Sequence, residues 1–308
     1  MIITRKRVAA LAAAAVFAVG ACSSGGGAVP PSTAPSADPG GAAGGSAGGG
    51  VSVACADGKI TALGSTALQP VVDAAAKRFS AACSGATIDV QGGGSGTGLT
   101  QVFQGGADIG NSDVAAEKKL KAEEAATLVD HIVARQGWLM IASKDVTGVT
   151  NLTSQQATDI WTGKITNWKD VGGPDLPIVL VLRPESSGTR AVFKEKVLGG
   201  AAEAAGQGLT EDSSGAVAQG VAQTPGATSV LAFAYYQANK GDLVGISLDG
   251  VEASVDNLAN GTYKLQDVGH MYTKGEPDGL KKAFLDYMLS DDVQNTLLPS
   301  LYYAPAGE

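Results

Sequence analysis

The sequence is poor in the groups that usually carry out bond chemistry. Its 308 residues include two histidines and three cysteines. His131 and His270 stand alone in the sequence and are interpreted as structural or surface residues, and no grouping of histidine, cysteine and carboxylate residues has the spacing of a metal site. A G-x-S-x-G nucleophile elbow is absent, and the glycine-rich stretch at 92–98 lacks the Gly-Lys-Ser/Thr ending of a Walker A loop. We therefore predict no catalytic residue, no metal and no cofactor.

Charge and length set further limits. Charged residues make up 17% of the chain and hydrophobic residues 44%, so the chain can form a proper core. The net charge of −8 at pH 7 argues against nucleic acid or an anionic membrane surface as the general partner. The length suits two modest domains or one large domain.

The first 21 residues have the organisation of a signal peptide. A basic start, Arg5 to Arg7, is followed by an apolar run from Val8 to Gly20 that is too short to span a bilayer easily. The cleavage region V-G-A-C resembles a bacterial lipobox, which would make Cys22 the lipidated first residue of the mature protein. The alternative is an ordinary secretory cleavage beside an incidental cysteine. We expect a protein anchored to the outer face of the cell membrane by a lipid on Cys22.

The next segment has the composition of a linker. Residues 23–51 are almost entirely glycine, alanine, serine and proline, and no part of them can bury an apolar face. Residues 22–51 are therefore predicted to be a lipidated N-terminus and a flexible tether.

Two cysteines, Cys55 and Cys83, follow the tether. An exported chain meets an oxidising environment, so a disulfide between them is expected. Two free buried thiols are the alternative.

Short apolar strands then alternate with amphipathic helices. Helices are predicted at about 67–81, from Thr97 onward and at 280–288, because apolar residues recur there at helical spacing. Strands are predicted at 60–63, 86–90, 137–143, 178–182, 229–236 and 243–247. This alternation indicates an α/β fold with mainly parallel sheets.

Three strand-to-helix corners offer the same chemistry. They are G-S-T-A-L-Q-P at 64–70, G-G-G-S-G-T-G at 92–98 and S-S-G-T at 186–189. Each supplies hydroxyl groups, glycine and backbone N–H groups at a helix N-terminus, which attracts an anion through its unpaired donors and its dipole. Taken singly, such a corner is an ordinary N-cap. If the three converge, they form a cage for a small tetrahedral oxyanion, to which Arg183 would add a charge-assisted contact.

Five segments together resemble the PstS-type phosphate-binding proteins of ABC importers. They occur in the family's order, and the similarity extends over nearly all of residues 58–305: GSTALQP, GGGSGTG, ADIGNSD, DIWTGKITNWKDV and RPESSGTR. The resemblance implies an α/β, two-lobed type II periplasmic-binding-protein fold with a ligand cleft between the lobes. Lobe one would comprise residues 52–132 plus 244–308, and lobe two would comprise residues 133–243.

By the same resemblance, the phosphate contacts fall on eight positions: Thr66, Ala67, Ser95, Asp113, Arg183, Ser187, Gly188 and Thr189. Ala67 would act through its backbone N–H, and it stands where some relatives have an aromatic residue. Glu185 stands where relatives often have Asp, and it would either brace Arg183 or face solvent. Trp161 and Trp168 are expected to pack the second lobe.

Asp113 is the least expected member of this set. A carboxylate repels a bound anion, and a closed cleft screens that repulsion poorly. From the residues alone, Asp113 would be interpreted as a helix cap that points away from the site. The resemblance places it in the cage, where it would accept the proton that phosphate carries near neutral pH and would exclude sulfate, which has none.

The sequence thus predicts an extracytoplasmic, lipid-anchored, monomeric receptor that delivers inorganic phosphate to the transmembrane permease subunits of an ABC importer. It is predicted not to be an enzyme. A receptor for another oxyanion, such as sulfate or molybdate, is the nearest alternative. A phosphatase would need a metal or a nucleophile with its base, and a surface adhesion or signalling module would bind no small ligand tightly.

Overall fold

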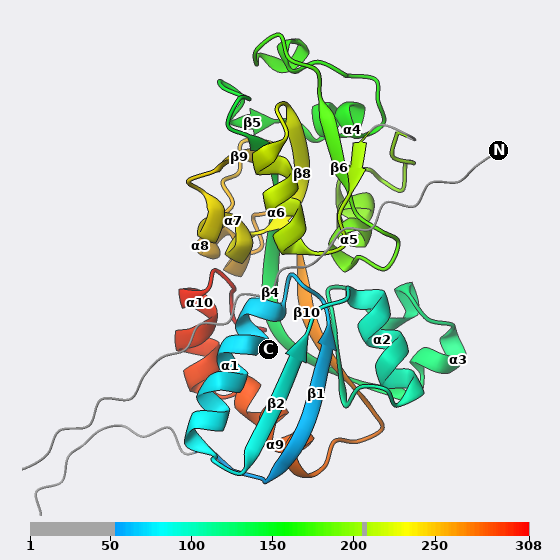
Figure 1. The fold of residues 1–308 in the computed structure, drawn as a ribbon, viewed down its shortest axis with the longest axis vertical. Helices are drawn as coiled ribbons and strands as arrows, with labels where there is room; N and C mark the ends of the chain where they lie inside the picture. The colour runs from blue at the N-terminus through cyan, green and yellow to red at the C-terminus, as the bar shows by residue number, and fades with distance from the viewer. Residues whose placement is uncertain (1–52, 205–207, 308) are drawn as a thin grey trace, which may run out of the picture. The chain divides into compact units, whose positions relative to one another are not determined.

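A computed structural model describes residues 53–204 and 208–307 (Figure 1). The predicted signal peptide, Cys22 and the predicted tether lie outside the described residues. The strands are β1 (Gly58–Gly64), β2 (Ala86–Gln91), β3 (Ile109–Ser112), β4 (Leu128–Ser143), β5 (Asn151–Leu152), β6 (Val179–Leu182), β7 (Gly208–Thr210), β8 (Ala227–Ala232), β9 (Leu243–Leu248) and β10 (Gln266–Lys274). The helices are α1 (Gln69–Ala82), α2 (Ser95–Gln104), α3 (Ala122–Ala125), α4 (Ser154–Trp161), α5 (Gly188–Lys196), α6 (Ser214–Gln223), α7 (Phe233–Asn239), α8 (Val255–Ala259), α9 (Gly279–Met288) and α10 (Leu298–Ser300), with short 3₁₀ or π turns at η1 (Ala116–Lys118), η2 (Trp168–Val171) and η3 (Val293–Leu297). Within these two ranges, no helix combines the length and the apolar character needed to cross a bilayer.

The first lobe is built on strands in the order β2-β1-β3-β10. β1 pairs in parallel with β2 and β3, whereas β10 runs antiparallel to β3. Helices α1 and α9 contribute the aromatic part of its core, where the rings of Phe79 and Phe284 meet edge to face with centroids 5.8 Å apart. α1 forms because its apolar side chains fall on one buried face and because Pro70 sits in its first turn, where no backbone N–H bond is lost.

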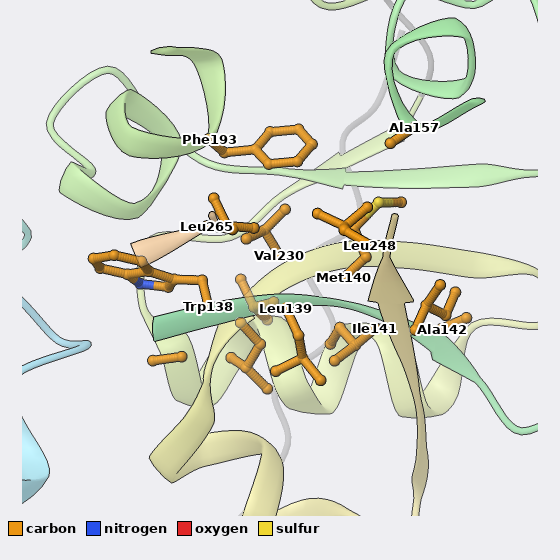
Figure 2. Packing of buried hydrophobic residues seen from close by; sticks show 14 of the residues in the cluster. Trp138, Leu139, Met140, Ile141, Ala142, Ala157, Phe193, Val230, Leu248 and Leu265 are labelled. Carbon is orange, nitrogen blue, oxygen red and sulfur yellow. The ribbon is translucent and has the colours of Figure 1, made fainter. Parts of the chain in front are cut away.

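The second lobe continues the sheet from β4 through β8, β6 and β7, with β9 also paired to β4. Its core is built around the apolar C-terminal part of β4. Figure 2 shows side chains of this strand, from Trp138 to Ala142, meeting Phe193 of α5, Val230 of β8 and Leu248 of β9. This C-terminal part of β4 is apolar on both faces, as expected where helices or strands cover both sides of a sheet. Trp161 and Trp168, which were expected to pack this lobe, are buried in the same cluster.

Two strands connect the lobes. β4 pairs with β10 from Leu128 to Gly137, and its later residues pair with β8 and β9. Ala134 packs in the core of lobe one and Trp138 packs in the core of lobe two. The chain therefore first crosses between the lobes around Gln136. β10 begins opposite Gly137 and carries the chain back into the first lobe.

This arrangement moves both expected boundaries. The first crossing was expected at 132–133, but Val133 and Ala134 pack in the core of lobe one, so it lies around Gln136. The sequence placed the return to lobe one at 243–244. Residues 243–248 form β9, which pairs with β4 inside the second lobe. Further along the chain, the core of the second lobe also contains Leu258, Tyr263 and Leu265. The return therefore lies at 265–266, where β10 starts.

The secondary structure largely matches the sequence pattern. The predicted helices correspond to α1, α2 and α9, and the α/β class is confirmed. Two expectations were wrong. The strand predicted at 229–236 ends at Ala232, because Phe233 turns into the core against Tyr263, with ring centroids 5.2 Å apart, and starts α7. The sheet is not mainly parallel, because the strands that join the lobes pair antiparallel with their neighbours.

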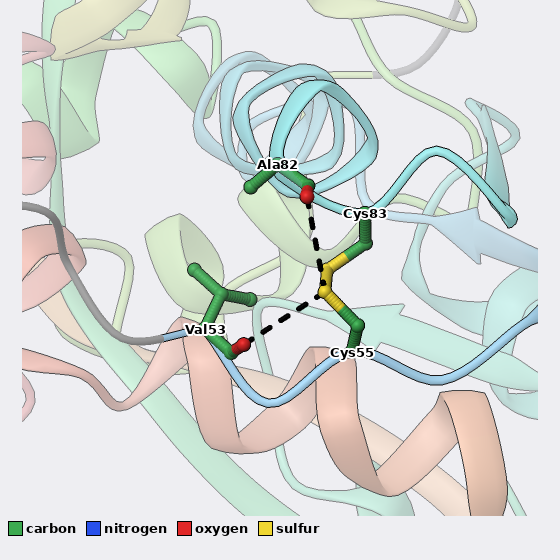
Figure 3. Close-up of a disulfide and its surroundings, with 4 residues drawn as sticks. All are labelled: Val53, Cys55, Ala82 and Cys83. Carbon is green, nitrogen blue, oxygen red and sulfur yellow. Dashed lines mark hydrogen bonds between the residues drawn. A yellow bond between two sulfur atoms is a disulfide. The ribbon is translucent and has the colours of Figure 1, made fainter. Parts of the chain in front are cut away.

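Cys55 and Cys83 form a disulfide with their Cα atoms 5.4 Å apart (Figure 3). The bond joins the residues before β1 to the end of α1. The Cys55 Sγ lies 3.8 Å from the carbonyl oxygens of Val53 and Ala82, and because a disulfide sulfur carries no proton, these are van der Waals contacts. Closing a loop of this length stabilises the fold by about 3–4 kcal/mol in the chain-entropy description. The bond thus ties down the point at which the described chain begins.

Candidate functional site

The first corner, Gly64–Pro70, carries β1 into α1. Ser65 is fully buried, and its hydroxyl accepts the backbone N–H groups of Ala67 and Leu68, each at 3.1 Å. The same hydroxyl donates to the carboxylate of Asp113. The Ala67 N–H, which was expected to serve the anion, is therefore already partnered by Ser65.

Thr66 of this corner meets the second lobe. Its Oγ1 lies 3.0 Å from the Oγ of Ser214 and accepts the Ser214 backbone N–H at 3.1 Å. Ser214 is the first residue of α6 and is buried. Sequence reasoning missed it, although the D-S-S-G run at 212–215 has the same hydroxyl and glycine character as the three quoted corners and opens a helix as they do.

The second corner docks against the third. Ser95 begins α2, and its Oγ accepts the backbone N–H of Asp113 at 2.9 Å, so its own proton remains to be donated. The backbone N–H of Gly96 donates to the carbonyl oxygen of Ser186 at 2.9 Å. Since Gly96 belongs to lobe one and Ser186 to lobe two, this main-chain bond joins the lobes at the site.

Arg183 follows β6 and is 5% exposed. Its Nη2 donates to the carbonyl oxygen of Asp212 at 3.1 Å, whereas its Nε and Nη1 are buried and find no acceptor among the residues that the structure describes. Burial lowers the pKa of this guanidinium, and the negative charge of Asp113 opposes that shift. An arginine stays protonated in proteins. Arg183 is therefore a desolvated positive charge with two donor nitrogens that require an acceptor, which is the chemistry of a small oxyanion.

Asp113 lies where the corners converge, and it is 2% exposed. Its Oδ1 accepts the Ser65 hydroxyl and the Nε2 of Gln136, the latter at 3.0 Å, and its Oδ2 accepts the Thr189 hydroxyl at 3.3 Å. The pKa of this carboxyl is raised on balance, because burial outweighs these hydrogen bonds and the charge of Arg183, which lower it. The interpretation of Asp113 as a helix cap that points away is wrong, because its carboxylate faces Thr189 of the other lobe.

Gln136 was also missed from the sequence. It is fully buried on β4, between the core clusters of the two lobes. A neutral amide inside the long strand-forming run A-R-Q-G-W-L-M-I-A is a usable signal, because a buried amide needs a polar partner. Here that partner is Asp113.

The third corner presents its backbone to lobe one. Ser187 is the N-cap of α5, and its Oγ accepts the backbone N–H of Arg190 at 3.2 Å. A Cβ atom on Gly188 would come 2.2 Å from the Ser95 Oγ and 2.7 Å from the Asp113 Cβ. Glycine is therefore required at 188 by close approach of the two lobes.

Lys119 bridges the lobes at the edge of the site. Its Nζ donates to the carbonyl oxygens of Glu185 at 2.6 Å and Ser187 at 3.2 Å. The Glu185 side chain is 82% exposed and pairs with Arg190 at 2.6 Å. Of the two expectations for Glu185, the structure thus favours the solvent-facing one over a brace for Arg183.

All eight predicted site residues are buried, and their contacts bring the three corners together. The donors are the Arg183 guanidinium, the hydroxyls of the corners and the N-terminal N–H groups of α2 and α5. One carboxylate, Asp113, lies among them as an acceptor. A donor cage with a single buried acceptor fits an oxyanion that still carries a proton.

Comparisons with known proteins agree with this chemistry. Residues 49–292 match the PBP superfamily domain. The phosphate-binding protein PstS of Bacillus subtilis (strain 168) is 46% identical over 253 residues, which cover 82% of each chain. A substrate-binding protein from Clostridium perfringens, solved with bound phosphate, has a TM-score of 0.74 at 32% identity and is covered over 99% of its length by 80% of this chain. An ABC-type phosphate transport receptor from Vibrio cholerae has a TM-score of 0.63 at 27% identity, with the same coverage.

The close approach at Gly188 generates a prediction. Gly188→Ala should hold the lobes apart, because the added methyl overlaps Ser95 and Asp113, and overpacking of this kind costs about 1–3 kcal/mol. Small-angle scattering in saturating inorganic phosphate, the anion that the sequence resemblance implies, should give a larger radius of gyration for the variant than for the wild type. Gly220→Ala is the matched control, because Gly220 lies in α6 and a Cβ there makes ordinary contacts of 3.5 Å or more with the Glu211 side chain. Equal radii for Gly188→Ala and the wild type would contradict the prediction.

Proposed function

Because the chain belongs to the PBP superfamily and, within it, to the PstS-type phosphate-binding proteins, we propose that it captures inorganic phosphate outside the cytoplasm and delivers it to the permease subunits of an ABC importer. The observation that carries this function is the pairing of a buried, incompletely satisfied Arg183 with a buried Asp113 acceptor. The chain is a receptor rather than an enzyme, in keeping with its relatives, which are named as binding proteins and transport receptors.

The eight site residues divide the work of holding phosphate. Arg183 supplies the positive charge and a planar pair of N–H donors, which suits two phosphate oxygens at once. The hydroxyls of Thr66 and Ser95 and the helix N-termini of α2 and α5, the latter formed by Ser187, Gly188 and Thr189, supply further donors, while the Thr189 hydroxyl bonds the Asp113 carboxylate. Asp113 accepts the proton of the phosphate. Ala67 contributes by holding the first corner in shape, since its N–H is bound by Ser65.

Asp113 also sets the selectivity against sulfate. Near neutral pH, phosphate has a proton to donate, and sulfate has none. Sulfate would therefore place an acceptor against the Asp113 carboxylate, in a site too buried to screen the repulsion. Sites built around such a buried mismatch reject the wrong ligand by factors of about 10⁴–10⁵.

Closure of the lobes completes the cage. The contacts Thr66–Ser214, Gly96–Ser186 and Asp113–Thr189 each join one lobe to the other at the site. Hinge closure about the two connecting strands would bring phosphate from solvent into contact with donors of both lobes. We assign residues 53–136 and 266–307 to the lobe that holds the first two corners.

The N-terminal segment defines where the receptor works. A signal peptide at 1–21, a lipid on Cys22 and a tether to residue 51 would hold a monomeric receptor at the outer face of the membrane, within reach of its permease. The sequence signals described above, a basic start, a short apolar run and V-G-A-C, support this attachment.

Arg183 provides a direct test of the site. Arg183→Ala should weaken phosphate binding by about 2–5 kcal/mol, because it removes the charged partner of a desolvated anion, and Arg183→Lys should recover only part of the loss, because an ammonium lacks the planar fork. Calorimetric titration of phosphate-free protein measures both. Arg78→Ala, which removes an exposed arginine paired with Asp292, should leave the affinity unchanged. Near-normal phosphate affinity in Arg183→Ala would refute the assignment.

Asp113 provides a test of selectivity. Asp113→Asn replaces part of the acceptor with an N–H donor, so sulfate should bind measurably while phosphate remains a ligand. Competition titration of both anions at matched ionic strength gives the comparison. Asp212→Asn is the charge-matched control, since Asp212 also acts on Arg183 but is exposed. If Asp113→Asn rejects sulfate as strongly as the wild type does, another group discriminates.

Cys22 provides a test of attachment. Cys22→Ala should release the protein from the membrane or block its processing, because the thiol that carries the lipid is gone. Detergent partitioning and mass spectrometry of the mature N-terminus measure the two effects. Undiminished retention of the variant in the membrane fraction would exclude the lipid anchor.

A further inference from the structure

Gln136 lies at the point where the chain first crosses between the lobes. It is on β4 opposite Asp267 of β10, so both connecting strands meet at this position. Its side chain is fully buried although it is polar. A buried amide at a crossing point is costly unless it is bonded, and its described hydrogen bond goes to the Asp113 carboxylate.

This bond decides which oxygen of Asp113 faces the second lobe. Oδ1 accepts both the Ser65 hydroxyl and the Gln136 Nε2. Oδ2 points toward the second lobe, where it accepts the Thr189 hydroxyl. A Cβ atom added to Gly188 would lie 2.7 Å from it. Gln136 and Ser65 therefore hold one oxygen inside lobe one and turn the other toward the cage.

The bond also favours the ionised form of Asp113. Burial raises the pKa of this carboxyl, and the Gln136 hydrogen bond is one of the interactions that lower it again. The other groups that act on Asp113 are the hydroxyls of Ser65 and Thr189 and the ionisable side chains Arg183, Lys119 and Tyr303. Like the Ser65 and Thr189 hydroxyls, the Gln136 amide donates a hydrogen bond to the carboxylate without being able to take up or release a proton in the accessible pH range.

We propose that Gln136 is a positioning residue for selectivity, which favours the ionised form of Asp113 and directs its Oδ2 at the ligand so that an oxyanion without a proton is rejected. This inference rests on the proposed phosphate-binding function. It assigns part of the selectivity to the strand that connects the lobes, outside the three corners that contact the anion.

Sulfate is the probe that isolates this role. It carries no proton at neutral or mildly acidic pH, so its own ionisation stays constant, and it should bind only when Asp113 takes up a proton and becomes a donor. Gln136→Met keeps a long side chain and removes the donor. The carboxyl of Asp113 should then protonate at a higher pH, because a hydrogen bond to a charged group is lost, and the onset of sulfate binding should move upward by about 1–2 pH units.

The experiment is calorimetric titration of the phosphate-free full chain with sulfate and with phosphate, from mildly acidic to mildly alkaline pH. Gln266→Met is the matched control. It makes the same glutamine-to-methionine change on the neighbouring strand, opposite Gly137, and among the described residues Gln266 has no hydrogen bond to Asp113. Gln136→Asn is a second test variant. It shortens the side chain by one methylene, which withdraws the donor, but it keeps a buried amide. Circular dichroism shows whether each variant folds, and Gln136→Asn replaces Gln136→Met in the test if the latter does not.

The outcomes separate the two claims. An upward shift of the sulfate profile in the Gln136 variants, with Gln266→Met following the wild type, supports the inference. Sulfate profiles of folded Gln136 variants that superimpose on the wild-type profile overturn it while leaving phosphate binding by the wild type intact. Failure of the wild type to bind phosphate at any pH would overturn the proposed function and the inference together.

Discussion

A carboxylate buried beside an anion site is the constraint on which the rest of this structure depends. Desolvation raises the pKa of the Asp113 carboxyl and so favours its protonated form, which is a donor. The chain counters this with hydrogen bonds from Ser65 and Gln136 and with the charge of Arg183. The buried arginine needs an anionic partner for the same reason that the buried aspartate needs donors. The charge of each group favours the charged form of the other, and the corners hold both groups in the site.

The two lobes share this task unequally. Lobe one holds Asp113 and the groups that bond its carboxylate from behind, and lobe two brings Arg183 and Thr189. Separation of the lobes would take Thr189 away from the carboxylate but leave Ser65 and Gln136 in place. The acceptor is therefore prepared within one lobe before the other closes on it. Such preorganisation lowers the entropic cost of binding, because fewer side chains have to be ordered when the ligand arrives.

The sequence predicted the fold class and the three corners that the structure brings together, and the features that it missed have physical causes. Strand–helix alternation gave the fold class, and hydroxyl and glycine residues at helix starts gave the three corners. Gln136 and Ser214 were overlooked because their roles arise from tertiary contacts. The amide within a strand and the D-S-S-G helix start are visible in the sequence, but their partners Asp113 and Thr66 are distant in it. The boundary at 243–244 was misplaced because local pattern does not reveal that β9 pairs with β4. Pairing partners that are distant in sequence decide such boundaries, and a single sequence does not contain them.

The bond between the Gly96 N–H and the Ser186 carbonyl has a consequence for how such a receptor can change over generations. Both groups belong to the main chain, so a change of side chain at Ser186 leaves the acceptor in place, whereas a Cβ on Gly96 would press on the Ser186 backbone at 3.2 Å. This one contact between the lobes is thus partly insulated from side-chain variation. Gly188 is not, because an added Cβ would overlap Ser95 and Asp113, so the corners can vary without changing closure only where their side chains do not face the other lobe.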